Sequence, residues 1–548
     1  MQRTLSRITH DRPHALFNTA ATRLIELAAA AALPPHTLMQ RAGLAVARLA
    51  MALAPHARTV WIACGPGNNG GDGLEAAARL QRSGKEVVVT WLGQPDRATA
   101  DTRSSWQRAR DAGVHWADAP PAHLTTADLC IDALLGIGVN SHSKSAPGAS
   151  QDRMHRCLNA LYRSPAPILA VDLPSGLDAD TGQFAGGFGP CPFAQSQPQS
   201  LAPDRAHHQT QTPSPRYTLS LLTLKPGLFT AAGRDAAGQI WLDCLGVDTH
   251  AATPSCQLSG PEAATPRAHA SHKGSFGDVA VIGGEGLSER GMGMSGAALL
   301  AASAALHSGA GRVLLALLDN GHQQLDPSQP ELMFRRFEAL ELEHLTAVCG
   351  CGGGLAVGNV LDEVITRAAQ LVLDADALNL IASHATLQTL VRARSERNQP
   401  TVLTPHPLEA ARLLGLTTTD IQADRLGAAQ QLAARFQCVA ILKGSGTVIA
   451  APYQTPAINP TGNARLATAG TGDVLAGMVG ARMAAHTSAQ RAACEAVYAH
   501  GLAADRWPPP LINARQRKTG ADASGPMDSM GANGPTLTAS ALARWVSR

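Results

Sequence analysis

A glycine-rich stretch in the second half, Gly470-Thr471-Gly472-Asp473, constrains the fold of this chain more than any other feature. It runs directly into an apolar helical pattern at 474–479. Free N–H groups of a first helical turn bind phosphate oxygens, and glycine lets those oxygens approach closely. An aspartate beside phosphate is electrostatically unfavourable, so chemistry explains Asp473 better than ligand affinity: it takes a proton from a substrate hydroxyl that attacks a phosphoryl group. The alternative is an aspartate that only caps the helix.

The longer segment Asn459–Gly477, N-P-T-G-N-A-R-L-A-T-A-G-T-G-D-V-L-A-G, resembles the anion-hole segment of the ribokinase-like fold. In particular it is similar to the segment found in ADP-dependent NAD(P)H-hydrate dehydratases. The G-T-G-D motif by itself fits a small-molecule kinase of the ribokinase-like type equally well, so this segment alone leaves both activities open.

The length and composition of the chain exclude several classes of protein. With 548 residues the chain is too long for one ordinary domain and suits two domains with additional segments. A formal net charge of +3 and 4% aromatic residues offer no basic, base-stacking surface for nucleic acid. The ten cysteines form neither a disulfide framework nor a C-x-x-C metal pattern, which favours a reduced cytoplasmic setting. No secretory signal is recognisable, and the apolar run Leu27–Leu33 is too short to span a membrane.

The first half alternates strand patterns with polar turns. After helices expected within 16–54, a strand at Thr59–Cys64 leads into G-P-G-N-N-G-G-D-G and a helix at Leu74–Arg82. This order is typical of Rossmann-like nucleotide-binding units, although the turn is not the G-x-G-x-x-G fingerprint. Later strand patterns end in Asp132 and Asp172, where an open parallel sheet places its ligand crevice. One strand-end aspartate is often a turn former; two of them beside an asparagine-rich loop indicate a site.

These motifs resemble the NAD(P)H-hydrate epimerase domain, whose hallmarks are N-N-G-G-D-G, D-A-L-L-G-x-G and V-D-x-P-S-G-L-D. The resemblance covers about residues 16–183 and resumes at Thr218–Leu228. It implies that Asp172 binds the hydrated cofactor and does the acid/base work at the epimerised carbon. It also implies a potassium ion, for which hard oxygen ligands are suited, held by Asn69, Asp132 and Ser175. The remaining implied contacts with the cofactor are Asn68, Asn69, Gly70, Gly71, Asp72, Gly136, Ile137, Gly138, Val139, Asn140, Ser141 and His142.

Several segments depart from these patterns. The loop 136–142 lacks the threonine and arginine expected around its second glycine, which leaves open an active second domain beside an inactive first one. Residues 183–216 are rich in Pro, Gln, Ser and His and cannot bury a core, so we expect a flexible insertion whose histidines are solvated. The Ala/Pro/Thr-rich segment 249–268 is expected to be a linker. Residues 508–537 form a low-complexity tail before a short closing helix at 538–546.

The second half contains further strand-then-turn units. A long small-residue helix is expected at Ser295–His307, and the segment Leu371–Asn379 places two carboxylates and an amide at a strand end. His406 stands between two prolines, whose fixed φ makes a stiff turn. The strand 439–443 opens onto K-G-S-G-T, a lysine with flexible backbone donors suited to nucleotide phosphates.

In this order the motifs resemble the ADP-dependent dehydratase domain from about residue 271 to 505. The resemblance implies that Asp473 is catalytic and contacts the hydrate, with Gly472 at the nucleotide. The nucleotide would be lined by Lys443, Gly444, Ser445, Gly446 and Thr447, and the hydrated cofactor by Ala297, Gly352 and His406. At Gly350–Gly354 the sequence G-C-G-G-G replaces the expected G-P-G-L-G, which keeps the glycine spacing without the proline.

We therefore expect an α/β protein with an N-terminal Rossmann-like three-layer domain (1–248) and a ribokinase-like α/β domain (269–548). The resemblance implies a bifunctional NAD(P)H-hydrate repair enzyme. It would epimerise R- and S-NADHX and NADPHX, and dehydrate the S form to NAD(P)H with ADP, Mg²⁺ and K⁺, yielding AMP and phosphate. The alternatives are a ribokinase-like small-molecule kinase with an N-terminal nucleotide-binding domain and a non-catalytic cofactor-binding protein, which the presence of both Asp172 and Asp473 disfavours. A homo-oligomer without nucleic-acid or membrane partners is expected.

Overall fold

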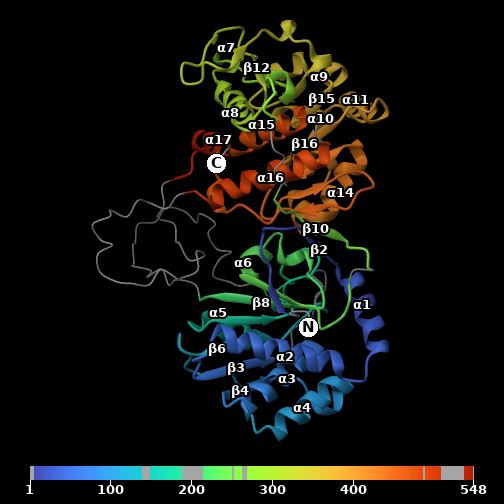
Figure 1. Ribbon diagram of the computed structural model, residues 1–548, viewed down its shortest axis with the longest axis vertical. Helices are drawn as coiled ribbons and strands as arrows, with labels where there is room; N and C mark the ends of the chain where they lie inside the picture. Colours follow the sequence, from blue (N-terminus) through green and yellow to red (C-terminus); the bar gives the residue numbers. More distant parts are fainter. Residues whose placement is uncertain are drawn as a thin grey trace, which may run out of the picture. The chain divides into compact units, whose positions relative to one another are not determined.

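The computed structural model describes residues 5–138, 149–186, 188, 214–249, 252–261, 268–485, 488–507 and 536–546. The chain forms two compact units (Figure 1): Met1–Thr9 with Ala15–Gln257, and His10–His14 with Leu258–Arg548. The second unit is therefore discontinuous in sequence, and within it the Tyr498 hydroxyl donates to the His10 carbonyl at 2.7 Å. The expected insertion 183–216 and tail 508–537 lie almost entirely outside the described residues.

The first unit is built on an eight-stranded sheet in the order β1-β9-β8-β7-β6-β3-β4-β5. Only β1 is antiparallel to its neighbour, and the other pairs are parallel. The strands are β1 Leu5–Arg7, β3 Thr59–Cys64, β4 Glu86–Trp91, β5 His115–Trp116, β6 Leu129–Ala133, β7 Ile168–Val171, β8 Arg216–Leu221 and β9 Gln239–Asp243. The helices are α1 Thr19–Ala32, α2 Thr37–Leu53, α3 Asn68–Arg82, α4 Ala100–Asp111, α5 Ala149–Arg163 and α6 Gly233–Ala237.

Both faces of this sheet are covered, as parallel strands require. Along β3 the side chains alternate: Val60 and Ile62 join a core with α2 and α3, whereas Trp61 and Ala63 join a second core with Leu158 and other residues of α5. Helix, sheet and helix thus form three layers, as expected from the sequence.

Helix α3 begins earlier than the sequence suggests. The glycine-rich turn before Leu74 was expected to be irregular, but the helix starts at Asn68 and includes N-N-G-G-D-G. A Cβ at Gly70 would stand 2.0 Å from the carbonyl oxygen of Gly65, and one at Gly73 would stand 2.6 Å from Ala133. The low helix propensity of glycine is overridden because only glycine permits this close helix–sheet contact.

The second unit contains the strands from β13 to β19 of a sheet in the order β13-β12-β11-β14-β15-β16-β17-β18-β19-β10-β2, and the unit boundaries fall within β10 and β2. Pairs from β13 to β17 are parallel, and β17, β18 and β19 are antiparallel. The strands are β2 His14–Leu16, β10 Cys256–Leu258, β11 Asp278–Gly283, β12 Arg312–Leu317, β13 Met333–Phe334, β14 Thr346–Cys349, β15 Gln370–Leu373, β16 Thr401–Leu403, β17 Val439–Leu442, β18 Val448–Ala450 and β19 Ala457–Ile458. Strand β10 falls inside the segment 249–268 that was expected to be a linker.

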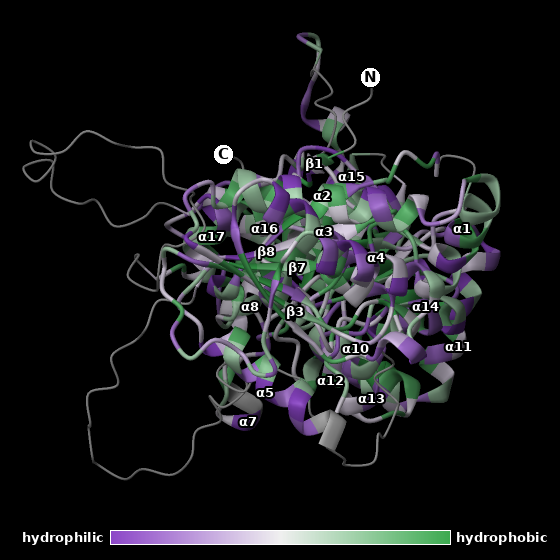
Figure 2. Cartoon of the chain, turned by 90° about the horizontal axis from the view of Figure 1, so that it is seen from below, coloured by the Kyte–Doolittle hydropathy of each residue, from purple (hydrophilic) through white to green (hydrophobic). Residues whose placement is uncertain are grey.

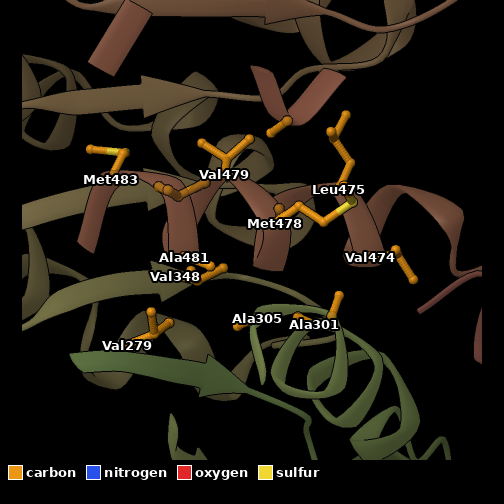
Figure 3. Packing of buried hydrophobic residues seen from close by; sticks show 14 of the residues in the cluster. Val279, Ala301, Ala305, Val348, Val474, Leu475, Met478, Val479, Ala481 and Met483 are labelled. Carbon is orange, nitrogen blue, oxygen red and sulfur yellow. The ribbon is translucent and has the colours of Figure 1, made fainter. Parts of the chain in front are cut away.

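The helices of the second unit are α7 Leu287–Arg290, α8 Ser295–His307, α9 Leu361–Arg367, α10 Ala375–Ser383, α11 Ala385–Glu396, α12 Pro407–Leu414, α13 Thr418–Ala423, α14 Arg425–Phe436, α15 Thr471–Ala484, α16 Ala489–Asp505 and α17 Ala539–Trp545. Helix α15 is buried on nearly every side. Figure 3 shows its apolar side chains above Ala301 and Ala305 of α8 and above Val279 and Val348 of the sheet. A Cβ at Gly477 would stand 2.0 Å from the Ala301 carbonyl oxygen, so glycine lets the two helices approach closely.

Hydropathy follows this layering. The strands in the interior are largely hydrophobic in Figure 2, whereas peripheral helices such as α4 are largely hydrophilic. In the described part of the chain, no helix has the length and apolar character needed to cross a membrane.

Candidate functional sites

Two residues predicted to hold a metal ion meet at the carboxyl end of β6 in the first unit. Asp132 is buried, and its carboxylate accepts hydrogen bonds from the Ser175 hydroxyl at 2.6 Å and the Ser175 N–H at 2.9 Å. The Leu135 N–H donates to the Ser175 hydroxyl oxygen at 2.8 Å, which fixes the following loop to the same point. Burial raises the pKa of Asp132, although the bonds from Ser175 oppose the shift.

Asn69, the third predicted ligand, lies in the first turn of α3 against the same loop. A Cβ at Gly136 would stand 3.3 Å from the Asn69 side chain, so Asn69 contacts the loop that Ser175 holds. Its amide nitrogen is buried and has no hydrogen-bond partner among the described residues. The site thus contains a buried carboxylate and the hydroxyl and amide oxygens of Ser175 and Asn69, and hard oxygen atoms of this kind suit a monovalent cation, whereas the Asn69 nitrogen is a donor and would not contact it.

The predicted cofactor loops are only partly described. Gly136, Ile137 and Gly138 follow β6, whereas Val139, Asn140, Ser141 and His142 lie outside the described residues. In the other loop, Asn68 is exposed and its side-chain oxygen accepts from Thr99 at 2.9 Å. Gly70 and Gly71 are buried by packing against Gly65 and Met39, and the pKa of Asp72 is raised by burial and by Asp172.

Asp172 has an unusual backbone conformation and a cationic partner. Its φ of 67° lies in the left-handed region, which is uncommon for a residue with a Cβ and marks a strained position. Lys225, 1% exposed at its side chain, forms an ion pair with the Asp172 carboxylate and donates to the Leu221 carbonyl at 2.7 Å. The Leu221 N–H also donates to Asp172 at 3.1 Å. The carboxylate is therefore held in one orientation.

A second carboxyl group approaches Asp172 from α1. The hydroxyls of Thr22 and Thr223 are 2.8 Å apart and hold α1 beside the segment that carries Lys225. Glu26 lies one helical turn after Thr22, on the same face. Burial and the Asp172 charge raise the pKa of Glu26, while Lys225 partly offsets the shift.

In the second unit Asp473 lies in the first turn of α15 beside a buried polar cluster. The Lys443 ammonium is 2.8 Å from Asp374, whose carboxylate also accepts from Thr404 at 2.7 Å. The Cys351 sulfur and carboxylate oxygens of Asp374 and Asp473 all lie within 4.8 Å of one another. Burial, followed by the charge of Asp374, raises the pKa of Asp473 to about 7, while Lys443 opposes the shift. Lys443 already compensates the negative charge of Asp374, where a metal ion would otherwise do so. The cluster is therefore better suited to proton transfer than to metal binding.

Two glycines shape the start of α15. Gly470 has a φ of 89°, a left-handed conformation that favours glycine, and a Cβ at Gly472 would stand 3.3 Å from the Lys443 ammonium. His500 of α16 is buried, and its Nε2 donates to the Thr471 carbonyl at 2.9 Å. Burial lowers the pKa of His500 to about 4, so the ring is neutral and acts as a fixed donor that positions this turn.

Two of the predicted hydrate contacts, Ala297 and Gly352, are neighbours in space. Gly352 has a φ of 57°, and a Cβ there would stand 2.9 Å from the Ala297 Cβ and 2.5 Å from the Met294 carbonyl oxygen. The glycine spacing retained in G-C-G-G-G therefore serves close packing between this loop and the start of α8.

His406 caps α12, and its ring is held in one tautomer. Its Nδ1 accepts from the N–H groups of Leu408 at 3.1 Å and Glu409 at 3.4 Å, so the proton of the neutral ring is on Nε2. Nε2 is 3.2 Å from the carboxylate of Glu409. Burial and Lys443 lower the pKa of His406, and burial raises that of Glu409 to about 7.

The predicted nucleotide loop, Lys443–Thr447, leaves the end of β17. Gly444 and Gly446 have positive φ values of 140° and 63°. The Thr447 hydroxyl donates to the Gly444 carbonyl at 3.1 Å, and the Thr447 carbonyl accepts from the Asn459 N–H at 2.9 Å. The loop is thereby joined to the start of the N-P-T-G-N segment, and Lys443 extends toward Gly472.

Comparison with known proteins shows the family. A family model described as NAD(P)H-hydrate dehydratase matches residues 279–513, and one described as YjeF-related protein N-terminus matches residues 35–227. The bifunctional NAD(P)H-hydrate repair enzyme Nnr of Escherichia coli K12 is 34% identical, with 86% of this chain and 85% of the relative covered. The chain belongs to the bifunctional NAD(P)H-hydrate repair enzyme family.

A second relative in this repair enzyme family agrees. The enzyme Nnr of Coxiella burnetii is 31% identical, with 89% of this chain and 94% of the relative covered. A solved structure of the ADP/ATP-dependent NAD(P)H-hydrate dehydratase of Bacillus subtilis, co-crystallized with ATP/Mg²⁺, is 34% identical, covers 45% of this chain and 86% of its own, and has a TM-score of 0.39. The predicted family and α/β class are confirmed, and the kinase alternative is not favoured, because the relatives match both halves of the chain.

Sequence reasoning missed several residues of this repair enzyme's two sites. Lys225 was noted only as part of a family-like segment, although a buried lysine is rare without an anionic partner. Glu409 and His500 were not selected, because neither motif nor spacing indicates that they contact His406 and Thr471. Asp374 was recognised at a strand end without its partner Lys443. The catalytic and binding roles assigned to individual residues stay predictions.

Proposed function

We propose that this repair enzyme carries out both reactions of its family in separate sites. The first unit interconverts the R and S epimers of NADHX and NADPHX, in which a nicotinamide ring carbon carries a hydroxyl. The second unit dehydrates the S form to NADH or NADPH, with ADP as co-substrate and AMP and phosphate as products. The observation that carries the proposal is Asp473: a carboxyl group with a pKa near 7, in the first turn of α15 beside Lys443 and Gly472.

In the dehydration, Asp473 takes the proton of the ring hydroxyl, and the hydroxyl oxygen attacks the terminal phosphoryl group of ADP. An O–P bond forms while the bond to AMP breaks. Phosphate then leaves the ring carbon more readily than hydroxide would, the neighbouring ring carbon loses a proton to solvent, and the ring double bond of NAD(P)H is restored. A base with a pKa near the working pH is suited to the first step. The N–H groups at the start of α15 and the Lys443 ammonium stabilise the charge that develops on the phosphoryl oxygens.

Mg²⁺ fits this site as a companion of the nucleotide. It would be held mainly by the phosphates of ADP and would supply further charge neutralisation. The choice of ADP over ATP follows from the family resemblance, since no described residue decides between them.

In the epimerisation, Asp172 would exchange a proton with the hydrated ring. Its ion pair with Lys225 fixes the position of its carboxylate, and its strained backbone points to a functional constraint. K⁺ would be held by Asn69, Asp132 and Ser175, where it would compensate the buried carboxylate and position the loop that begins at Gly136.

The test follows the reduced-cofactor absorbance of an NADHX epimer mixture with the full-length protein. Four reactions contain ADP, ATP, no nucleotide, or ADP with the Asp473→Asn variant. We expect full conversion with ADP and none in the variant. Conversion that stops once the S form is consumed would refute the epimerase assignment, and the Asp172→Asn variant should show that stop. Absence of conversion with every nucleotide would overturn the dehydratase assignment.

The homo-oligomeric state and the cytoplasmic location stay predictions. Light scattering of the purified protein and fractionation of the source cells would check them.

A further inference from the structure

Arg425, the first residue of α14, is a cation buried beneath the Lys443–Thr447 loop. Arg425 is 2% exposed, and its Nη2 donates to the carbonyls of Leu442 and Lys443, both at 3.2 Å. Nη1 donates to Gln422 at 2.7 Å, while Nε is buried without a hydrogen-bond partner among the described residues. Burial lowers the pKa of Arg425 to about 10, so it remains charged at neutral pH. A buried charge of this kind is costly unless an anion compensates it.

Among the described residues, no carboxylate forms an ion pair with Arg425. Burial is the whole cause of the lowered pKa, whereas a nearby anion would have raised it. The hydrogen-bond partners of the guanidinium are two carbonyls and an amide, which are dipoles rather than charges. In the described part of the chain, the positive charge is therefore left for an anion that the protein itself does not provide.

A second buried arginine, Arg394, binds backbone carbonyls far from the predicted site and serves as a comparison. Arg394 of α11 is 0% exposed, its pKa is also lowered to about 10, and it donates to the carbonyls of Ile365 and Ala368 at 2.6 and 2.9 Å. Its Nε also donates to Thr401 at 2.7 Å. These partners lie at the amino ends of β15 and β16, at the sheet edge opposite the predicted site. Arg425 instead binds the carboxyl end of β17, where the nucleotide loop begins.

The guanidinium also fixes how this loop leaves the strand. A Cβ at Gly444 would stand 2.8 Å from both Nη atoms, and the φ of 140° suits glycine, so the loop backbone rests directly on Arg425. The peptide bonds of the described chain are trans, which makes the N–H of each peptide unit point opposite to its carbonyl. Because Arg425 holds the Lys443 carbonyl, the Gly444 N–H is directed to the other side of the loop, away from Arg425.

We propose that Arg425 is a positioning residue for a nucleoside diphosphate: it sets the Gly444 N–H toward the bound phosphates, and those phosphates supply the anion that its buried charge lacks. The inference rests on the proposed nucleotide role of Lys443–Thr447. Oriented backbone N–H groups over a fixed positive charge are suited to phosphate rather than to the uncharged parts of the nucleotide.

The experiment measures the dissociation constants of ADP and adenosine by calorimetry on the full-length protein, together with thermal unfolding. The variants are Arg425→Met and the matched control Arg394→Met. For Arg425→Met we expect ADP binding to weaken at least ~10-fold, the size of one lost charge-assisted interaction, with adenosine binding changed by less than ~3-fold. Arg394→Met should lower the unfolding temperature while the ratio of ADP to adenosine affinity stays at the wild-type value.

Three outcomes overturn the proposal. In the first, Arg425→Met weakens ADP and adenosine binding equally, as a merely structural residue would. In the second, both variants lower the unfolding temperature and neither changes ADP binding. If Arg425→Met does not fold, Arg425→Gln replaces it: the amide keeps a donor for the carbonyls but removes the charge, so a wild-type ratio of ADP to adenosine affinity in that variant refutes the proposal that the phosphates compensate this charge. Failure of the wild-type protein to bind ADP would instead refute the proposed function itself, and this inference with it.

Discussion

The Asp473→Asn variant should be inactive yet more stable than the wild-type protein. The ordinary pKa of an aspartate is 3.8, and burial with the charge of Asp374 raises that of Asp473 to about 7. Ionised Asp473 therefore opposes folding: the penalty grows as the pH rises from about 3.8 to about 7 and is constant above that range. Asparagine removes the charge and keeps an oxygen that accepts from the Cys351 thiol.

The size of the effect follows from the pKa difference. About three pH units at 1.36 kcal/mol each give an upper bound of about 4 kcal/mol. Asp473 is partly exposed, so solvent screening reduces this bound, and we expect a gain of about 1–2 kcal/mol at pH 8. In a unit of this size, that gain raises the unfolding temperature by roughly 2–6 °C. The gain should be smaller at pH 5, where the folded wild-type protein holds Asp473 mostly protonated.

The assay is thermal unfolding of both proteins at pH 5 and pH 8, read from the transition that the substitution moves. The control is Asp376→Asn, because the Asp376 carboxylate accepts from the Gly354 N–H at 2.9 Å and its loss should bring no gain. A gain for Asp473→Asn that is equal at both pH values, or a loss at pH 8, would refute the reasoning. It would mean that Asp473 titrates near its ordinary pKa and is not tuned as a base.

Three further sets of substitutions test the two units. Lys225→Met leaves Asp172 buried without its cation, so we expect the free energy of unfolding, measured by chemical denaturation, to fall by about 3–5 kcal/mol. The variant should lose epimer interconversion and keep dehydration of the S form. Epimerisation at the wild-type rate would contradict the role of Lys225. Gly477→Ala places a Cβ 2.0 Å from a backbone oxygen, whereas the Cβ of Gly480→Ala meets a valine methyl at 2.4 Å that can move. Gly477→Ala should therefore lower the free energy of unfolding by about 1–3 kcal/mol more than Gly480→Ala. Equal stabilities of the two variants would contradict the close helix contact. His406→Asn keeps an acceptor for the helix cap and should be about 1 kcal/mol more stable than His406→Ala. Both variants lose the ring Nε2–H and should therefore raise the KM for the hydrate. An unchanged KM would exclude a contact between His406 and the hydrate.

Much of the fold could be predicted because local pattern and tertiary structure agree. The apolar run Thr59–Cys64 is a strand with the predicted bounds, and the small-residue segment Ser295–His307 is a helix with the predicted bounds. The start of α3 could not be predicted, because its glycines are helical only through contact with Gly65 and Ala133, which are distant partners that propensity does not record. Strand β10 is a similar case, since its polar surroundings read as a linker and its pairing depends on the rest of the sheet.

The candidate sites show the same division between motif and contact. Asp473 and Asp172 could be selected because glycine-rich or strand-end patterns mark them in the sequence. The ion pairs around them could not: Lys225 is 53 positions from Asp172, and Lys443, which was selected only as a nucleotide contact, is 69 positions from Asp374. A single sequence gives no signal for such pairs, and the tuned pKa of Asp473 depends on Asp374, which lies almost a hundred positions away.

The hydrogen bond between Tyr498 and His10 has a consequence for synthesis. Its ends are 488 positions apart, and a ribosome adding 5–20 residues per second needs roughly 25–100 s to cover that distance. Residues 10–14 therefore emerge first but reach their own unit last, after the intervening unit has had time to fold. A nascent chain stalled before Tyr498 should leave this segment open to proteolysis, and its protection would mark completion of the second unit.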